Sequence, residues 1–358
     1  MKSFINNKRL VVRMVKGALS CLLAASVCVA AEPVKDALNR PSVMSEAAAH
    51  SFFIGADYAG KRIVMVGERG LILISDDDGK NWKQVESPVS VTLTAVQFAN
   101  SDVGFAIGHG GTVLSTIDGG EHWQTRLNGY DIAQSILKSA ELSGDELAIA
   151  SAKRLVADGP DKPLLDLAVL SPTEIIVVGA YGLAMKSTDG GVSWVSIMDA
   201  FDNDFGMHLY SICKKGRRIL IAGEQGLVRL SIDNGKTFQT IETPYEGSYF
   251  TAELTENEGI VLAGMRGNVL GSSDQGLTWK YLTVPVPASI SASTYSPDLG
   301  VIIANQAGMI FGLGQRDYFK ALSSKTLPLL NNILLTGDKG LIALSAVGPI
   351  SVTLEAQQ

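Results

Sequence analysis

The chain has 358 residues, of which 46% are hydrophobic and 18% charged, with 37 glycines and a formal net charge of −6. This composition is typical of a folded protein with a large core, and it excludes a disordered chain, a collagen and a coiled coil. Without residues 1–31, which carry five basic side chains and no acidic one, 25 basic residues face 36 acidic ones and the net charge is −11. A phosphate backbone would repel so acidic a protein, so nucleic acid is not an expected partner.

Residues 1–31 are predicted to be an export signal. A basic stretch ending at Lys16 precedes the apolar run from Gly17 to Ala31, and small residues stand before Glu32, as signal peptidase requires. The apolar run is shorter than the roughly 20 residues of a membrane span, so we expect cleavage and a periplasmic location. Cys213 would then be the only cysteine of the mature chain, which excludes an intramolecular disulfide.

A repeat of about forty residues follows an N-terminal segment, residues 32–51, and covers residues 52–358. An aliphatic run ending in a Gly-x-x-Gly turn occurs seven times, with Asn305 in place of the first glycine in the sixth copy, and the last glycines are Gly70, Gly111, Gly182, Gly226, Gly267, Gly308 and Gly340. Each turn lies between two β-branched or aliphatic runs, which predicts two strands joined by a tight turn. Gly111 and Gly182 are 71 positions apart, which indicates an insertion after the second copy.

Five copies carry a second motif, Ser/Thr-x-Asp-x-Gly-x-x-Trp/Phe, at a constant distance after the glycine turn. Its aspartates and aromatic residues are Asp77 and Trp82, Asp118 and Trp123, Asp189 and Trp194, Asp233 and Phe238, and Asp274 and Trp279. We interpret this Asp-box as a hairpin whose aspartate accepts hydrogen bonds from turn amides while the aromatic ring packs on the hairpin. These aspartates are therefore predicted to be structural, and not acid catalysts or metal ligands.

Four short strands per forty residues, repeated seven times, predict an all-β fold, a seven-bladed β-propeller in one domain. The ring closes either with residues 350–354 as the outer strand of blade seven or with residues near Val43. The insertion, about 130–161, contains Asp131 with Gln134 and Ser143 with Glu146, pairs that resemble capping boxes. It is predicted to be a helical hairpin between blades two and three, either functional or decorative.

One face of such a propeller carries the glycine turns and the connections between blades. Loops on a stiff scaffold are where binding residues concentrate, although several of the aromatic residues have the alternative of capping the blades. The candidate binding residues on this face are Glu68, Arg69, His109, Tyr130, Tyr181, Phe201, Asp202, Asp204, Phe205, His208, Glu224, Tyr245, Tyr249, Arg266 and Lys339.

Catalytic motifs are sparse. The four histidines lack metal-ligand spacing, and the glycine turn at 108–111 lacks the helix of a phosphate loop. Asp202-Asn203-Asp204 resembles only a fragment of a calcium loop. No catalytic residue, cofactor or metal is therefore predicted. Glycan binding, or glycoside hydrolysis by carboxylates from different blades, stays open as the alternative.

The composite motif of glycine turn and Asp-box, clear from Val178 to Trp194, is similar to that of the photosystem II stability and assembly factor family of exported seven-bladed propellers. This resemblance covers nearly the whole mature chain. It implies a chaperone-like, non-enzymatic scaffold that binds a membrane-protein complex, or accompanies a membrane exporter, on the extracytoplasmic side. In a phototroph, the location implied is the thylakoid lumen.

This chain departs from the family pattern in that it lacks a convincing lipobox, carries the predicted helical hairpin and has few arginines in its turns. The family implies an arginine-rich face, yet only Arg69 and Arg266 lie in the predicted glycine turns. Sialidase-like glycosidases also contain Asp-boxes, but the chain lacks the Arg-Ile-Pro stretch of that family.

Overall fold

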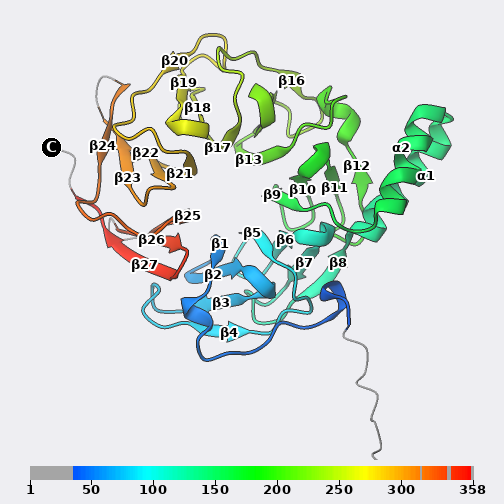
Figure 1. The fold of residues 1–358 in the computed structure, drawn as a ribbon, viewed down its shortest axis with the longest axis horizontal. Coiled ribbons are helices and arrows are strands. Elements are labelled where there is room, and N and C mark those ends of the chain that lie inside the picture. The colour runs from blue at the N-terminus through cyan, green and yellow to red at the C-terminus, as the bar shows by residue number, and fades with distance from the viewer. Residues whose placement is uncertain (1–34, 315–316, 337–339, 356–358) are drawn as a thin grey trace, which may run out of the picture. The chain divides into compact units, whose positions relative to one another are not determined.

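A computed structural model describes residues 35–314, 317–336 and 340–355, so the predicted export signal lies outside the described residues (Figure 1). The chain from Asp36 onward forms one compact unit. Seven antiparallel sheets surround a central channel in this unit, which confirms the predicted propeller (Figure 1). Within the described ranges, no helix combines the length and the apolar character needed to cross a membrane.

Six blades have four strands and the seventh has three, and within each blade we letter the strands A to D from the channel outward. Blades one to three are β1 (Phe53–Ala59), β2 (Arg62–Gly67), β3 (Ile72–Ser75) and β4 (Lys83–Val85); β5 (Leu93–Phe98), β6 (Gly104–Gly108), β7 (Val113–Thr116) and β8 (Gln124–Leu127); and β9 (Leu164–Val169), β10 (Ile175–Gly179), β11 (Ala184–Ser187) and β12 (Val195–Ser196).

The remaining blades follow the same order. They are β13 (Leu209–Lys215), β14 (Arg218–Gly223), β15 (Val228–Ser231) and β16 (Gln239–Thr240); β17 (Tyr249–Leu254), β18 (Ile260–Gly264), β19 (Val269–Ser272) and β20 (Lys280–Tyr281); β21 (Ile290–Ser296), β22 (Gly300–Asn305), β23 (Ile310–Leu313) and β24 (Phe319–Ala321); and β25 (Leu330–Thr336), β26 (Gly340–Ser345) and β27 (Gly348–Thr353). The B–C turns and D–A connections form one face, which we call the glycine-turn face. The A–B and C–D turns form the opposite Asp-box face.

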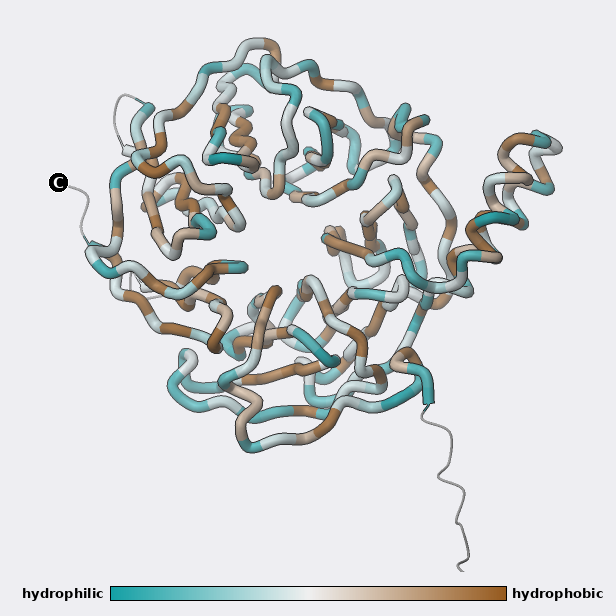
Figure 2. Tube along the Cα trace, in the orientation of Figure 1, coloured by the Kyte–Doolittle hydropathy of each residue, from teal (hydrophilic) through white to brown (hydrophobic). Residues whose placement is uncertain are grey.

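The core lies between neighbouring blades. Strands β6, β10 and β18 are buried along their whole length, because a B strand is covered on both sides. Hydrophobic residues, coloured brown in Figure 2, recur along the blades. Val64 of blade one, for example, packs in one cluster with Val96 and Ala106 of blade two. Burial of each valine or leucine side chain contributes about 1.5–3 kcal/mol. Each blade therefore depends on its neighbours for stability.

The Asp-boxes are local hydrogen-bond networks within the C–D hairpins. In blade three, the buried Ser187 hydroxyl donates to Asp189 and accepts from the Gly191 N–H (both 2.9 Å), while Ser193 N–H donates to the same carboxylate at 2.9 Å. Trp194 Nε1 donates to Gly191 O at 3.0 Å. Hydrogen bonds from Ser193 lower the pKa of Asp189 to about 2. The carboxylates of Asp77, Asp118, Asp233 and Asp274 each accept from the N–H four residues later in the same way.

The insertion is a helical hairpin, as predicted, formed by α1 (Gly129–Ser143) and α2 (Glu146–Asp158) (Figure 1). The predicted caps were wrong. Asn128 caps α1, with Asp131 at the third helical position completing the capping box, and Asp145 caps α2. Ile132 in the first turns of α1 is buried in the cluster between blades two and three, so the base of the hairpin is part of the core.

The seventh copy of the repeat is shifted by one strand from its predicted position. The run from Ile333 to Gly340 was predicted to be the strand before a glycine turn, but Ile333 lies in β25, the innermost strand. Candidate Lys339 comes after β25 in the sequence and lies outside the described residues. The cause of the shift is a shortened copy, since Gly308 and Gly340 are only 32 positions apart.

The ring closes with the C-terminal strand β27 as the outer described strand of blade seven. Val43 instead runs beside blade one, where its carbonyl accepts from Gln84 Nε2 at 2.9 Å. Three side chains join blades seven and one at the channel. Asn331 Nδ2 donates to Phe53 O, Asn332 Nδ2 donates to Ile54 O, and Tyr58 Oη donates to Leu335 O, each at 3.0 Å.

Similar side-chain bridges join other neighbouring blades. Asp57 Oδ2 accepts from Phe98 N–H at 2.7 Å, and Asp166 Oδ2 accepts from Ile212 N–H at 2.8 Å. Thr94 Oγ1 donates to Leu164 O at 2.8 Å. The inner edge of a strand A has no neighbouring strand, so these side chains satisfy backbone groups that would otherwise be unpaired.

The channel encloses about 260 Å³ and contains two carboxyl groups, those of Asp166 and Glu253. Glu253 Oε1 accepts from Ser293 Oγ at 2.9 Å. Burial raises the pKa of both groups to about 7, because few water molecules solvate the charged form there. Burial also raises the pKa of Asp57 to about 6.

We predict that Ser187→Ala destabilises the protein by about 1–3 kcal/mol, because it leaves the Gly191 N–H without its acceptor in a buried site. Ser187 is only 1% exposed. Urea unfolding measures the change. The matched control is Ser193→Ala, at an exposed serine that donates to the same Asp189 carboxylate and keeps its backbone N–H. It is expected to cost less than about 0.5 kcal/mol. Equal effects of the two changes would contradict this role for the buried hydroxyl.

We also predict that the channel carboxyls make the protein more stable as the pH falls from about 7 to about 4.5. Because the pKa of Glu253 is higher in the folded state than in the unfolded state, the folded state binds more protons in this window. Glu253→Gln should flatten the pH dependence of the unfolding free energy by up to about 1.4 kcal/mol per pH unit.

The control for this measurement is Glu86→Gln, at an exposed position after β4. It should leave the slope between pH 4.5 and 7 unchanged. An unchanged slope in Glu253→Gln would mean that Glu253 titrates at an ordinary pKa, and the channel would then be well hydrated.

Candidate functional site

The glycine turns of blades one to five share one backbone geometry. In blade one, Gly67 N–H donates to Leu71 O and Leu71 N–H donates to Glu68 O, both at 3.0 Å. A side chain on Gly67 would collide with Phe52 O, which comes within 2.2 Å of the position of its Cβ. The first glycine is therefore required by the close approach of the chain that enters the inner strand.

The second residue of these turns is in the left-handed region, which disfavours any residue with a Cβ. Blade two has glycine there, Gly110, at φ 66°. The other four turns have Arg69, Tyr181, Gln225 and Arg266, with φ between 51° and 58°. All four side chains are exposed on the glycine-turn face. A left-handed non-glycine residue costs about 1 kcal/mol, so four turns retain a side chain at a position where glycine is easier to accommodate.

The sequence-predicted site residues differ in exposure. The exposed ones are Arg69, His109, Tyr130, Tyr181, Asp202, Asp204, Phe205 and Arg266, and the half-buried ones are Glu68, His208, Glu224 and Tyr245. Two predictions were wrong, because Phe201 and Tyr249 are fully buried and cannot contact a partner. Phe201 packs edge-to-face on Phe238 of the Asp-box in blade four, and the Tyr249 hydroxyl donates to Thr243 Oγ1 at 2.8 Å.

The fold brings together some of these residues at the junction of blades three and four. His208 Nδ1 accepts from Tyr181 N–H at 3.1 Å, and His208 N–H donates to Glu224 Oε2 at 3.1 Å. Gly206 lies against the backbone of Tyr181, which places its neighbour Phe205 beside the same turn. Phe205 is 88% exposed and Tyr181 is 56% exposed. Arg69, His109 and Arg266 lie in the turns of blades one, two and five, so the arginines do not form a patch.

An edge-to-face row of aromatic rings begins at this junction and continues to the channel. The ring centroids of Tyr181 and His208 are 4.9 Å apart, those of His208 and Tyr210 are 5.9 Å apart, and those of Tyr210 and Phe250 are 5.3 Å apart. Tyr210 and Phe250 line the channel. Edge-to-face contacts at these distances stabilise the arrangement of the rings. We call these four residues the aromatic row.

A groove of about 500 Å³ separates the helical hairpin from blade three. Its walls include Ala140 of α1, Ala152 and Leu155 of α2, and Met198 and Tyr181 of blade three. Tyr181 thus belongs both to the groove and to the aromatic row. Lys162 Nζ lies 5.2 Å from the centroid of the Tyr181 ring, within cation–π distance.

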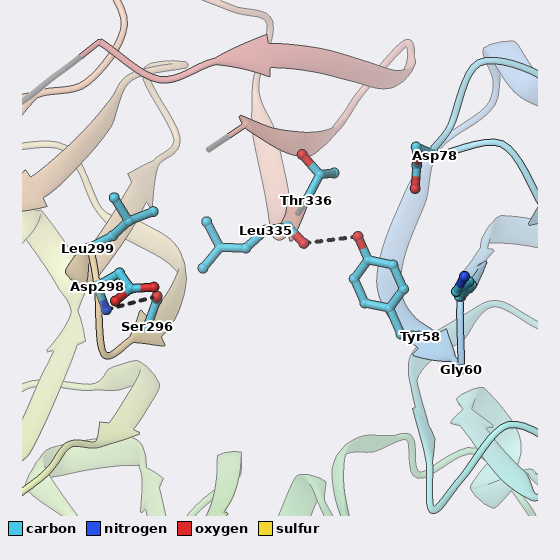
Figure 3. A pocket seen from close by; sticks show the side chains of 9 residues that line it. Tyr58, Gly60, Asp78, Ser296, Asp298, Leu299, Leu335 and Thr336 are labelled. Atoms are coloured by element: carbon cyan, nitrogen blue, oxygen red, sulfur yellow. Dashed lines mark hydrogen bonds between the residues drawn. The ribbon is translucent and has the colours of Figure 1, made fainter. Parts of the chain in front are cut away.

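A further hollow, of about 930 Å³, lies on the Asp-box face where blades six, seven and one meet (Figure 3). Tyr58 and Thr336 line it from one side, and Ser296, Asp298 and Leu299 line it from the other (Figure 3). None of the sequence-predicted site residues borders this hollow. It was missed because most of its lining comes from A–B turns, which carry no repeated motif, with Asp78 of the first Asp-box beside them.

The channel carboxyls were also missed by the sequence analysis. The signal for them was an acidic residue inside an aliphatic strand, as in Leu165-Asp166-Leu167 and Ala252-Glu253-Leu254. Throughout the part of the chain that the structure describes, no group of three or more His, Cys, Asp or Glu side chains is arranged to hold a metal ion. In the stretch that resembled a calcium loop, Asn203 instead bonds its own loop, with Nδ2 donating to Met207 O at 2.9 Å.

Similarity to solved structures supports the fold. A structure described as "YCF48 bound to D1 peptide" has a TM-score of 0.64 and 12% identity, covering 88% of this chain and 100% of that chain. "YCF48 from Cyanidioschyzon merolae" has a TM-score of 0.63 and 16% identity, covering 88% of this chain and 98% of that chain. The WD40 β-propeller domain of Doa1 has a TM-score of 0.61 and 9% identity, covering 89% and 97%.

Sequence similarity gives the family. The curated "Photosystem II assembly protein Ycf48" of Synechococcus sp. (strain JA-3-3Ab) is 27% identical over 155 residues, covering 37% of this chain and 46% of the relative. The chain therefore matches less than half the length of that relative. The family model described as "Photosynthesis system II assembly factor YCF48" matches residues 80–161 and 154–283, which together make up more than half of the chain. The chain belongs to this YCF48 assembly factor family.

Proposed function

We propose that the protein is a non-enzymatic assembly factor that binds a segment of a membrane protein on its glycine-turn face. The observation that carries the proposal is the retention of Arg69, Tyr181, Gln225 and Arg266 in left-handed turn positions, with their side chains exposed. Backbone strain is found preferentially where a side chain serves recognition. Gly110 shows that the same turn forms with glycine, so the fold itself does not require these side chains.

The relatives support binding as the activity. The family is one of assembly factors, and one solved relative is described as bound to a D1 peptide. We infer that this chain likewise binds a polypeptide segment, contributed by a membrane-protein complex or exporter. The stiff ring fixes the positions of the turns, so little conformational entropy is lost when a partner binds.

We further propose that binding takes place outside the cytoplasm. This proposal rests on the basic and apolar pattern of residues 1–31, which is typical of an export signal. A membrane protein would then be reached on its extracytoplasmic side.

To test the binding face, we predict the behaviour of a turn-glycine variant that combines Arg69→Gly, Tyr181→Gly, Gln225→Gly and Arg266→Gly. Glycine relieves the left-handed strain but adds entropy to the unfolded chain. These opposing effects are of similar size, about 1 kcal/mol or less per site, so the variant should fold. Capture of membrane proteins from detergent-solubilised membranes by the tagged variant should fall at least about tenfold.

The matched control changes three left-handed non-glycine residues on the Asp-box face, as Asp78→Gly, Asn234→Gly and Gln275→Gly. It makes the same kind of backbone change and should capture the partner as the unmodified protein does. Undiminished capture by the turn-glycine variant, or an equal loss in the control, would contradict binding through the glycine-turn face.

A separate prediction concerns export. In a bacterial host, the purified protein should begin at Glu32 or Ala31, as read by mass spectrometry of its N-terminal peptide, and should be released with the periplasmic fraction. Replacing the small residues directly before the cleavage site, as Ala30→Arg with Ala31→Arg, should block processing, because signal peptidase requires a small side chain there. Recovery of full-length protein in the cytoplasm without these changes would contradict export.

A further inference from the structure

The loops around the aromatic row contain many more acidic than basic residues. Residues 158–163, 180–182, 198–208, 224–226 and 241–248 around the row contain one basic residue, Lys162, and the acidic residues Asp158, Asp161, Asp199, Asp202, Asp204, Glu224, Glu242 and Glu246. Two exposed arginines lie outside these ranges, Arg154 of α2 at the hairpin groove and Arg266 in the turn of blade five, so acidic residues still outnumber basic ones. Lys162 is already paired with Asp161 and Asp158, at 2.5 and 3.4 Å. The surface around the row is therefore electronegative.

The nearest buried cation does not offset this charge at the surface. Arg229 is only 7% exposed, and it donates to the backbone carbonyls of Phe201 and Asp202 from below. It makes no ion pair within 4 Å among the described residues. The carboxylates of Asp202 and Asp204 remain exposed above it. A ligand that approaches the row meets carboxylates and aromatic rings.

The protein itself shows which group these rings accept. Lys162 Nζ lies over the Tyr181 ring at 5.2 Å, an ammonium against an aromatic face. Beside this turn, Phe205 is exposed without a cation over it in the described structure. Rings bordered by carboxylates are suited to lysine and arginine side chains, whose aliphatic stems pack on the rings while the charged ends reach the carboxylates.

The spacing of the row favours an extended ligand. Successive ring centroids are 4.9 to 5.9 Å apart. Side chains on one face of an extended strand are about 6.6 Å apart, which is close to this spacing. The row also links the hairpin groove, through Tyr181, to the channel, through Tyr210 and Phe250. The row therefore extends from one cavity to the other across blades three to five.

We propose that the aromatic row and the carboxylates around it bind an extended polypeptide segment rich in lysine or arginine. This inference rests on the proposed function and specifies the chemistry of the partner segment. The segment lies along the row with alternate side chains toward the rings. Its cationic groups pair with the exposed carboxylates of Asp199, Asp202, Asp204 and Glu246.

Fluorescence polarisation with three labelled peptides tests the proposal on the purified protein. In the first peptide lysine alternates with alanine, and in the others glutamine or glutamate replaces each lysine. The lysine peptide should bind at least about tenfold more tightly than the glutamine peptide. Its affinity should fall between about 0.05 M and 0.5 M salt, because exposed charges are screened. The glutamate peptide should not bind.

Two variants locate the binding. Tyr181→Gly with Phe205→Ser should weaken lysine-peptide binding about tenfold, and Asp202→Asn with Asp204→Asn should weaken it about threefold while reducing its salt dependence. The control, Ile117→Ser with Leu277→Ser, removes two exposed apolar side chains from the Asp-box face and should bind normally. Melting curves confirm that each variant is folded.

Equal affinity for the lysine and glutamine peptides, absence of binding by all three, or an equal loss in the control would overturn the proposal. Such a result would not contradict the proposed function, which is capture of a membrane protein by the glycine-turn face. Undiminished capture by the turn-glycine variant overturns the proposed function instead, so the two failures are distinguishable.

Discussion

The innermost strand of each blade has one edge that faces the channel and has no neighbouring strand. Its N–H and C=O groups need partners, because an unpaired backbone group that is buried costs free energy. Side chains from the adjacent blade supply several of them, as Asp57 does for Phe98 and Asp166 does for Ile212. Side-chain hydrogen bonds of the same kind, donated by Asn331 and Asn332 to backbone carbonyls of blade one, close the ring between blades seven and one. The blades are thereby held together at the channel as well as through their apolar faces.

A ring joined in this way gives the loops on its two faces fixed positions. In blades one to five, each Asp-box satisfies the turn amides of its own C–D hairpin, so these hairpins are stabilised locally. On the glycine-turn face, the left-handed turn positions expose the long side chains of Arg69, Tyr181, Gln225 and Arg266, whereas on the Asp-box face Asp78 and Asn234 are residue types that accept this region more readily. Rigid aromatic groups on a rigid scaffold lose little entropy on binding. In the proposed function, local hairpin stability is the role of the Asp-box face and recognition the role of the glycine-turn face.

Much of the fold was predictable from the sequence, because the glycine turns and Asp-boxes depend on local geometry that recurs in every copy. Blade seven was misplaced by one strand because its copy lacks an Asp-box and is shorter. The candidate site was predicted less well, since exposure depends on packing between blades. Phe201 and Tyr249 were predicted to lie on the same loop face as Tyr181, yet they fill the core. The pairing of Tyr181 with His208, 27 positions later, likewise required the structure.

Site-specific photo-crosslinking in the living cell tests the central claim most directly. A photoreactive residue at Gln225, on the glycine-turn face beside the aromatic row, should give a covalent adduct with a membrane protein. The same residue at Leu277, which is 84% exposed on the Asp-box face, should give none. An adduct from Leu277 but not from Gln225 would contradict the account, because it would place the partner on the face that the structure assigns to local stability.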